Sequence, residues 1–97
     1  MAKEKNLHSL SEALNAFIKE NKLQKGIDKV MVKKAWEKIM DNGVNNYTTA
    51  VELRNDTLFV SLSSSVLREE LSHGKSKIID MINEEMNKDL VKNIVLR

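Results

Sequence analysis

Apolar residues in the first part of the chain recur at the spacing of an α-helix. Five of them share one helical face: Leu10, Ala13, Leu14, Phe17 and Ile18. Ser9 precedes this run, and Glu12 follows three residues later, which is the sequence of a capping box. The pattern predicts a first helix from about Leu10 to Lys22, with a break near Gly26.

A second stretch shows the same period. Its apolar positions are Val32, Ala35, Trp36, Ile39 and Met40. Asp28 lies just before this stretch and is a suitable N-cap residue. After it comes the sequence Asp41-Asn42-Gly43, in which Asn42 or Gly43 suits the left-handed position beyond a helix end. We therefore expect a second helix that begins at Asp28 and closes at these residues.

The period then changes from that of a helix to that of a strand. Apolar and polar residues alternate over 47–54 and again over 57–63, with Asn55-Asp56 between the two segments. A two-residue loop at this point pairs Arg54 with Thr57, Leu53 with Leu58, Val51 with Val60 and Thr49 with Leu62. The apolar residues of both strands then share one face, so the pattern predicts a half-buried hairpin.

A third helix is expected after the hairpin. Ser63-Ser64-Ser65 provides candidate N-cap residues, and Gly74 interrupts the helix and marks a bend or a close packing contact. The apolar stripe of this helix comprises Val66, Leu67, Leu71, Ile78, Ile79, Ile82 and Met86. Residues 91–97 are short and rich in β-branched side chains, which is typical of a strand.

These elements predict an α+β fold in the order helix, helix, strand, strand, helix, strand, with a three-stranded sheet packed by helices. We expect a flexible lead-in over residues 1–8 and a single domain over residues 9–97. The position of the third strand beside the first or the second strand is left open. Ninety-seven residues build one modest core.

Composition narrows the classes of function. The chain has no cysteine and a net charge of only +2, which excludes disulfides, zinc–thiolate sites and histone-like binding. It has no apolar run long enough to span a membrane, and its first residues are charged, so we expect a cytoplasmic protein without a membrane partner.

Catalytic and cofactor signatures are absent. The sequence contains no phosphate-binding loop, and His8 and His73 lack a second metal ligand at helical spacing. The triple serine lacks a flanking base and a Gly-bounded turn, so helix capping explains it better than nucleophilic catalysis. We therefore expect no enzyme activity, no catalytic, cofactor or metal site, and no small-molecule substrate.

Two features suggest binding instead. Trp36 lies in an apolar stripe, where a core position is favoured over a role as a partner anchor. Lysines are concentrated between the first two predicted helices: Lys22, Lys25, Lys29, Lys33, Lys34 and Lys38. This series is either a weak, non-sequence-specific nucleic-acid surface or an ordinary polar helix face, and charge alone does not decide between them.

Several motifs together resemble the DciA family of bacterial replicative-helicase loaders. The first is Trp36 with the apolar residues after it and Gly43, and the second is the hairpin with Thr57-Leu58-Phe59-Val60. The serine-rich junction follows, with Ser64 and Ser65 leading to Leu71. The closing helix and the final strand complete a resemblance that covers about residues 9–97.

The resemblance implies a fold like a type II K-homology domain. It also implies an adaptor that binds the replicative DNA helicase and aids its loading without hydrolysing ATP. Many members carry a basic C-terminal extension, which this sequence lacks, so we expect any DNA binding to be weak. A Gly-x-x-Gly loop is also missing, which places RNA below DNA as a partner.

Overall fold

The computed structural model describes the backbone of residues 2–97 and the side chains of residues 9–97. Its elements run in the order α1 (Ala2–Ile39), α2 (Asn42–Asn45), β1 (Thr48–Arg54), β2 (Thr57–Leu62), α3 (Ser65–Ser72), α4 (Lys75–Met86) and β3 (Asn93–Leu96). The predicted α+β class with a three-stranded sheet is confirmed. The predicted flexible lead-in covers residues 1–8, whose side chains lie outside the described part of the chain.

Helix α1 is one continuous helix of 38 residues, and the two separate helices predicted here were wrong. Gly26 lies within it without a left-handed φ, and a Cβ at this position would meet no atom within 4 Å. A glycine in an exposed helix costs only about 1 kcal/mol relative to alanine, so good helix formers on both sides carry α1 through it. Ser9 and Asp28 are therefore interior helical residues, and neither is an N-cap.

The end of α1 is stabilised by Asn45. Its Nδ2 donates hydrogen bonds to the carbonyl oxygens of Glu37 at 2.9 Å and Met40 at 3.0 Å, which are acceptors that a helix end leaves unpaired. Neither Asn42 nor Gly43 adopts the predicted left-handed conformation. Asp41 instead caps α2, because its side chain accepts a hydrogen bond from the backbone N–H of Val44.

The hairpin follows the predicted register over most of its length. Arg54 pairs with Thr57, Leu53 with Leu58 and Val51 with Val60, and Asn55 takes the positive φ of 55° that the tight turn needs. The predicted pair of Thr49 with Leu62 is wrong.

A bulge at the start of β1 causes this shift, so that Thr48 pairs with Leu62. Thr48 is held there by two hydrogen bonds. Its Oγ1 accepts the indole N–H of Trp36 at 3.2 Å and donates to the carbonyl oxygen of Val44 at 2.9 Å. These contacts fix the first residue of the strand, and one extra residue is then accommodated as a bulge.

The structure settles the position of the last strand. β3 pairs in parallel with β2, which gives the order β1-β2-β3 with β2 in the centre. The chain reaches this position by crossing back over the sheet through α3 and α4, as a parallel connection requires.

The predicted third helix is divided in two at Gly74. Ser64 caps α3, since its Oγ accepts a hydrogen bond from the backbone N–H of Leu67 at 3.2 Å. α3 ends at Ser72, and Gly74 occupies the N-cap position of α4. α4 closes at Asn87, whose φ of 58° is the left-handed C-cap conformation.

One core joins all three strands to α1 and α4. Its buried members are Val32, Ala35, Trp36, Leu53, Leu58, Val60, Leu62, Ile78, Ile82, Val91 and Ile94. Trp36 is completely buried, so the core interpretation of this residue is confirmed. Leu71 packs against the core from α3, whereas Ser65 is exposed at the start of that helix.

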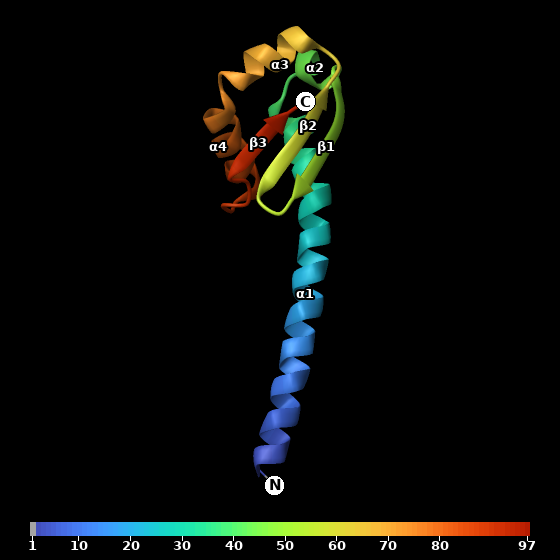
Figure 1. Ribbon diagram of the computed structural model, residues 1–97, viewed down its shortest axis with the longest axis vertical. Coiled ribbons are helices and arrows are strands. Elements are labelled where there is room, and N and C mark those ends of the chain that lie inside the picture. The colour runs from blue at the N-terminus through green and yellow to red at the C-terminus, as the bar shows by residue number, and fades with distance from the viewer. Residues whose placement is uncertain (1) are drawn as a thin grey trace.

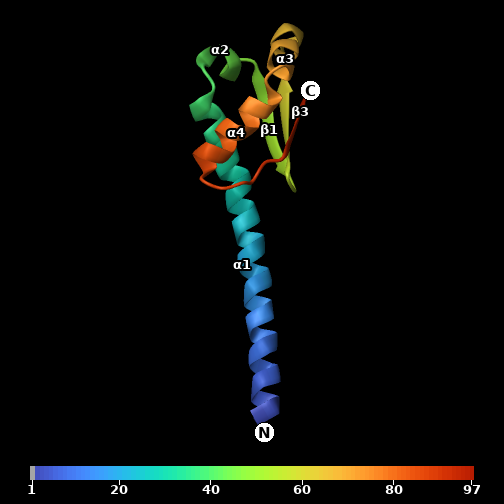
Figure 2. The same cartoon turned by 90° about the vertical axis from the view of Figure 1, so that its left-hand side faces the viewer.

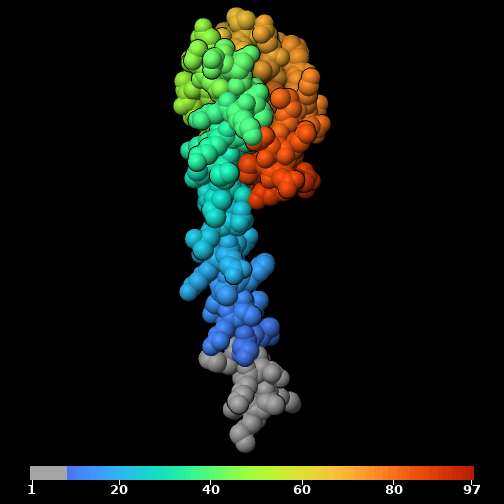
Figure 3. Space-filling model, turned by 180° about the vertical axis from the view of Figure 1, so that it is seen from behind, coloured from blue at the N-terminus to red at the C-terminus, as the bar shows by residue number. Residues whose placement is uncertain are grey.

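Burial alternates along β2, where Leu58, Val60 and Leu62 face the helices. α1 and α4 pack on this face of the sheet (Figure 2). The lower part of α1 projects far beyond the domain (Figure 1), and the molecule measures 67 × 21 × 20 Å. The space-filling view shows the same rod attached to a compact head (Figure 3).

Candidate interaction surfaces

The projecting part of α1 carries exposed apolar side chains. Every residue from 9 to 27 is exposed. A stripe of four large apolar side chains lies on it, with exposed fractions of 50–66%: Leu10, Leu14, Phe17 and Ile18. We refer to these four residues as the N-terminal stripe. Contiguous exposed apolar residues on this scale mark sites of protein association.

A second apolar group lies further along the same helix. It comprises Leu23, Ile27, Val30 and Met31, which line a shallow hollow with Lys22 and Gly26. Leu23 and Ile27 follow Leu14 and Ile18 by nine residues, which is two and a half helical turns. This mid-helix patch therefore faces away from the N-terminal stripe, and a partner can reach it without displacing the domain.

The structure separates the six predicted lysines. Lys22, Lys25, Lys29 and Lys33 follow one another at spacings of three or four residues, so they share one side of α1. Lys34 and Lys38 lie on a different side, and Lys38 forms an ion pair with Glu85 of α4 at 2.7 Å. The six residues therefore do not form a single patch.

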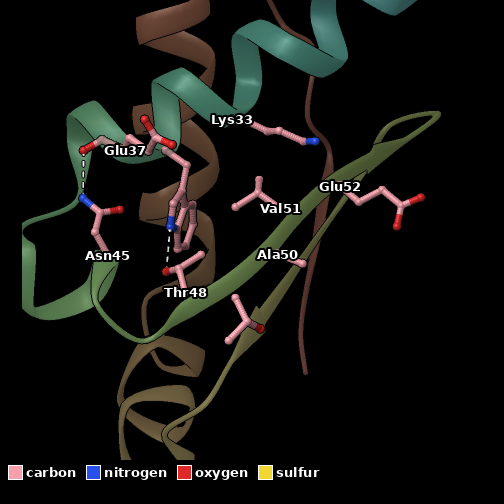
Figure 4. A pocket seen from close by; sticks show the side chains of 9 residues that line it. Lys33, Glu37, Asn45, Thr48, Ala50, Val51 and Glu52 are labelled. Carbon is pink, nitrogen blue, oxygen red and sulfur yellow. Dashed lines mark hydrogen bonds between the residues drawn. The ribbon is translucent and has the colours of Figure 1, made fainter.

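Lys25 and Lys29 line a crevice between α1 and the hairpin, together with Arg54. Their neighbour Lys33 lines a groove between α1 and β1 with Thr49, Ala50 and Glu52 (Figure 4). The basic side of α1 thus borders the first strand of the sheet, where Glu52 provides an acidic neighbour.

A cluster that sequence reasoning missed lies on the open face of the sheet. Phe59, at the centre of β2, has the guanidinium carbons of Arg54 and Arg97 at 5.3 and 4.8 Å from its ring centroid. Glu52 binds Arg54 through two hydrogen bonds of 2.9 and 3.2 Å. The hydrogen bonds from Arg54 lower the pKa of Glu52. Slight desolvation acts in the opposite direction, while the charges of Arg54, Arg97 and Lys29 add to the lowering.

The point where α1 leaves the domain is held by an ion pair. Asp28 is buried and accepts a hydrogen bond from Lys88 Nζ at 2.5 Å and another from Gln24 Nε2 at 2.9 Å. Burial alone raises the pKa of Asp28, but the hydrogen bonds from Lys88 and Gln24 and the charge of Lys88 outweigh it, so the pKa is lowered. Sequence reasoning missed this role, because Lys88 is sixty residues away.

No arrangement typical of an active site occurs in the described residues. His73 faces only Glu69, at 3.6 Å on an exposed helix surface, and no group of three or more histidine or acidic residues there could hold a metal ion. Among the described helices none is long and apolar enough to cross a membrane. What the surface offers is an apolar helix, a basic helix face and an arginine–aromatic cluster, which are features of binding proteins.

The described part of the chain is thus a small α+β domain with a projecting helix that carries exposed apolar and basic residues. The family model described as "Dna[CI] antecedent, DciA" matches residues 9–96, so the chain belongs to the DciA family. The suspected resemblance is confirmed over nearly the whole chain. No curated protein and no solved structure matched it.

Proposed function

We propose that this protein is an adaptor that binds the replicative DNA helicase and aids its loading during DNA replication without hydrolysing ATP. The family match over residues 9–96 carries the proposal. The exposed apolar residues of α1 support it, because a protein that acts by association needs such a surface.

We propose the mid-helix patch as the helicase-binding surface. Its four large apolar side chains are 45–67% exposed, and a helix that presents apolar residues three and four positions apart can dock into a partner's groove. The patch faces away from the core side of α1. Binding there leaves the packing of Val32 and Trp36 intact.

Titration of the full chain into the replicative helicase of the same organism, followed by calorimetry, tests the adaptor proposal. We expect a saturable complex that forms without ATP. The absence of any heat or co-elution at tens of micromolar concentrations would contradict a helicase-binding role.

The fold itself supports a further part of the proposal, a type II K-homology-like architecture. One long helix precedes a hairpin, and two helices then lead to a final strand parallel to the central one. A K-homology domain clamps RNA with a Gly-x-x-Gly loop, which the sequence lacks. RNA binding of that kind is therefore not part of the proposal.

A second candidate function is weak, non-sequence-specific binding of DNA, favoured by the position of Lys25 and Lys29 beside Arg54. Four lysines on one side of α1 can each neutralise a phosphate, and such binding weakens as salt increases. Reversing Lys29 and Lys33 to glutamate should abolish retention of single-stranded DNA at low salt. A single reversal at Lys34, on the other side of α1, should weaken retention less than a single reversal at Lys29.

A further inference from the structure

The N-terminal stripe is a continuation of the face that α1 buries in the domain. Leu14, Phe17 and Ile18 precede Val32, Ala35 and Trp36 by eighteen residues each, which corresponds to five full turns of an α-helix. The first set is at least half exposed, whereas the second is buried. The same side of the helix thus has a partner over its last third and lacks one along the stripe.

No other described element of the chain covers the stripe. The nearest apolar group, the mid-helix patch, lies on the opposite side of the same continuous helix and cannot turn toward it. Burial of large apolar side chains is the main favourable term in association, at about 25 cal/mol per Å² of area. Any cover for this face must therefore come from a second molecule.

We propose that the stripe is covered by the same stripe of a second copy of this chain, with the two helices antiparallel and a two-fold axis at Leu14. In this register Leu14 faces its counterpart, and Leu10 faces Ile18 of the other copy. Three of the four stripe residues thus face stripe residues of the other copy, as an isologous contact requires, and Phe17 lies opposite Ser11. Glu12 is the only charged residue between Leu10 and Ile18, and it lies off the stripe, so no like charges meet within the stripe.

The position of the domain selects the antiparallel orientation. The core face begins at Asp28, where the loop after α4 binds α1 through Lys88. Two parallel helices paired along the stripe would place both domains in the same space. In the antiparallel pair the second helix begins, at Ala2, opposite residue 26 and so stops short of the first domain. Leu14 lies at the middle of the projecting stretch from Ala2 to Ile27, so the two projecting stretches overlap fully.

This inference is independent of the helicase proposal, and cysteine cross-linking tests it directly. The chain has no native cysteine, so single substitutions report one position each. Under mild oxidation Leu14→Cys should form a disulfide-linked dimer, since its Cα atoms lie near the axis. Leu10→Cys should not, because in this register its two copies are about 12 Å apart. A mixture of Leu10→Cys and Ile18→Cys should cross-link, whereas Ala16→Cys, on the outer side of α1, should form no disulfide between copies.

Sedimentation equilibrium of the unmodified chain provides the second measurement. We expect a concentration-dependent dimer, and Leu14→Glu should weaken it at least about tenfold, because two charges would meet on the axis. Leu14 is exposed in the single copy, so circular dichroism of this variant should remain that of the folded chain.

Three results would overturn the proposal. One is a monomer at the highest concentration attainable. Another is self-cross-linking of Leu10→Cys as readily as Leu14→Cys, which would indicate a parallel pair. The third is a thiol at position 14 that becomes protected only when the helicase is added, since a different partner would then occupy the stripe.

Discussion

Asp28 and Lys88 form an ion pair of 2.5 Å that joins the middle of α1 to the loop between α4 and β3. The carboxylate is buried at the level where α1 leaves the domain, and Gln24 contributes a second hydrogen bond from one turn earlier. This contact therefore lies at the point where the helix stops packing on the domain and begins to project.

The lowered pKa of Asp28 makes stability depend on pH in the acid range. A carboxyl group whose pKa is lower in the folded state stabilises the fold above its unfolded pKa, which is near 3.8. This contribution is lost as the pH falls through the folded value. We expect Asp28→Asn to lower the free energy of unfolding at neutral pH by about 1–2 kcal/mol.

Urea unfolding at a series of pH values measures this effect. The difference between the original chain and Asp28→Asn should shrink as the pH falls below about 4, because the unfolded chain then takes up a proton at this group while the folded carboxylate, with its lowered pKa, is still charged. Asp80, an exposed acid on α4, provides a matched control as Asp80→Asn. An equal loss of stability in both variants would contradict the role of the Lys88 contact.

Gly26→Ala distinguishes a continuous α1 from two helices with a break. Within a continuous exposed helix, alanine should stabilise the helix by about 0.5–1 kcal/mol relative to glycine. The helix content or the free energy of unfolding should therefore increase. A Cβ here meets no neighbouring atom. Circular dichroism and thermal unfolding measure the change, and a loss of helical signal would indicate a broken helix at this point.

Asn83 is expected to stabilise the fold through the loop that precedes β3. Its Oδ1 accepts hydrogen bonds from the backbone N–H groups of Leu90 and Val91, and its Nδ2 donates to the carbonyl oxygen of Val91 at 2.8 Å. Asn83→Ala leaves these groups unpaired beside the buried Val91 and should cost about 1–3 kcal/mol. Chemical denaturation measures this loss in the free energy of unfolding. Asn87→Gly, which keeps the left-handed C-cap, is the control and should change the free energy of unfolding far less.

Val30→Ser together with Met31→Ser should weaken helicase binding at least about tenfold, because apolar side chains would be lost from the proposed docking surface. Both residues are exposed in the single chain, so the melting temperature should change little. Val66→Ser on α3 removes a more exposed apolar residue far from the patch and serves as the control. Unchanged affinity in the double variant would place the binding surface elsewhere.

The hairpin was predictable because its determinants are local. A turn of two residues at Asn55-Asp56 and the alternation on both sides specify the register of Leu53 with Leu58. The cap at Ser64 was equally readable from three consecutive serines. The bulge at Thr49 was not, because it follows from a hydrogen bond between Trp36 and Thr48 that connects separate elements.

The prediction of two helices in place of α1 was wrong for a physical reason. Gly26 and Asp28 each favour a helix break by only about 1 kcal/mol. At Gly26 the good helix formers on both sides outweigh this preference. Asp28 instead forms the contact with Lys88. The lysine surface was likewise only partly predictable from the sequence. The ion pair that separates Lys38 from the other lysines depends on how α4 packs, because its partner Glu85 lies on that helix.

The opposite orientation of the two apolar faces of α1 has a consequence for valency. In an antiparallel pair the mid-helix patches would lie on outer sides that point in opposite directions, about 39 Å apart along the helices when measured from Ile27 to Ile27. One partner molecule could then occupy one patch but not reach around to the other. Such a pair would bridge two partner molecules, and it would gain no avidity for a single one.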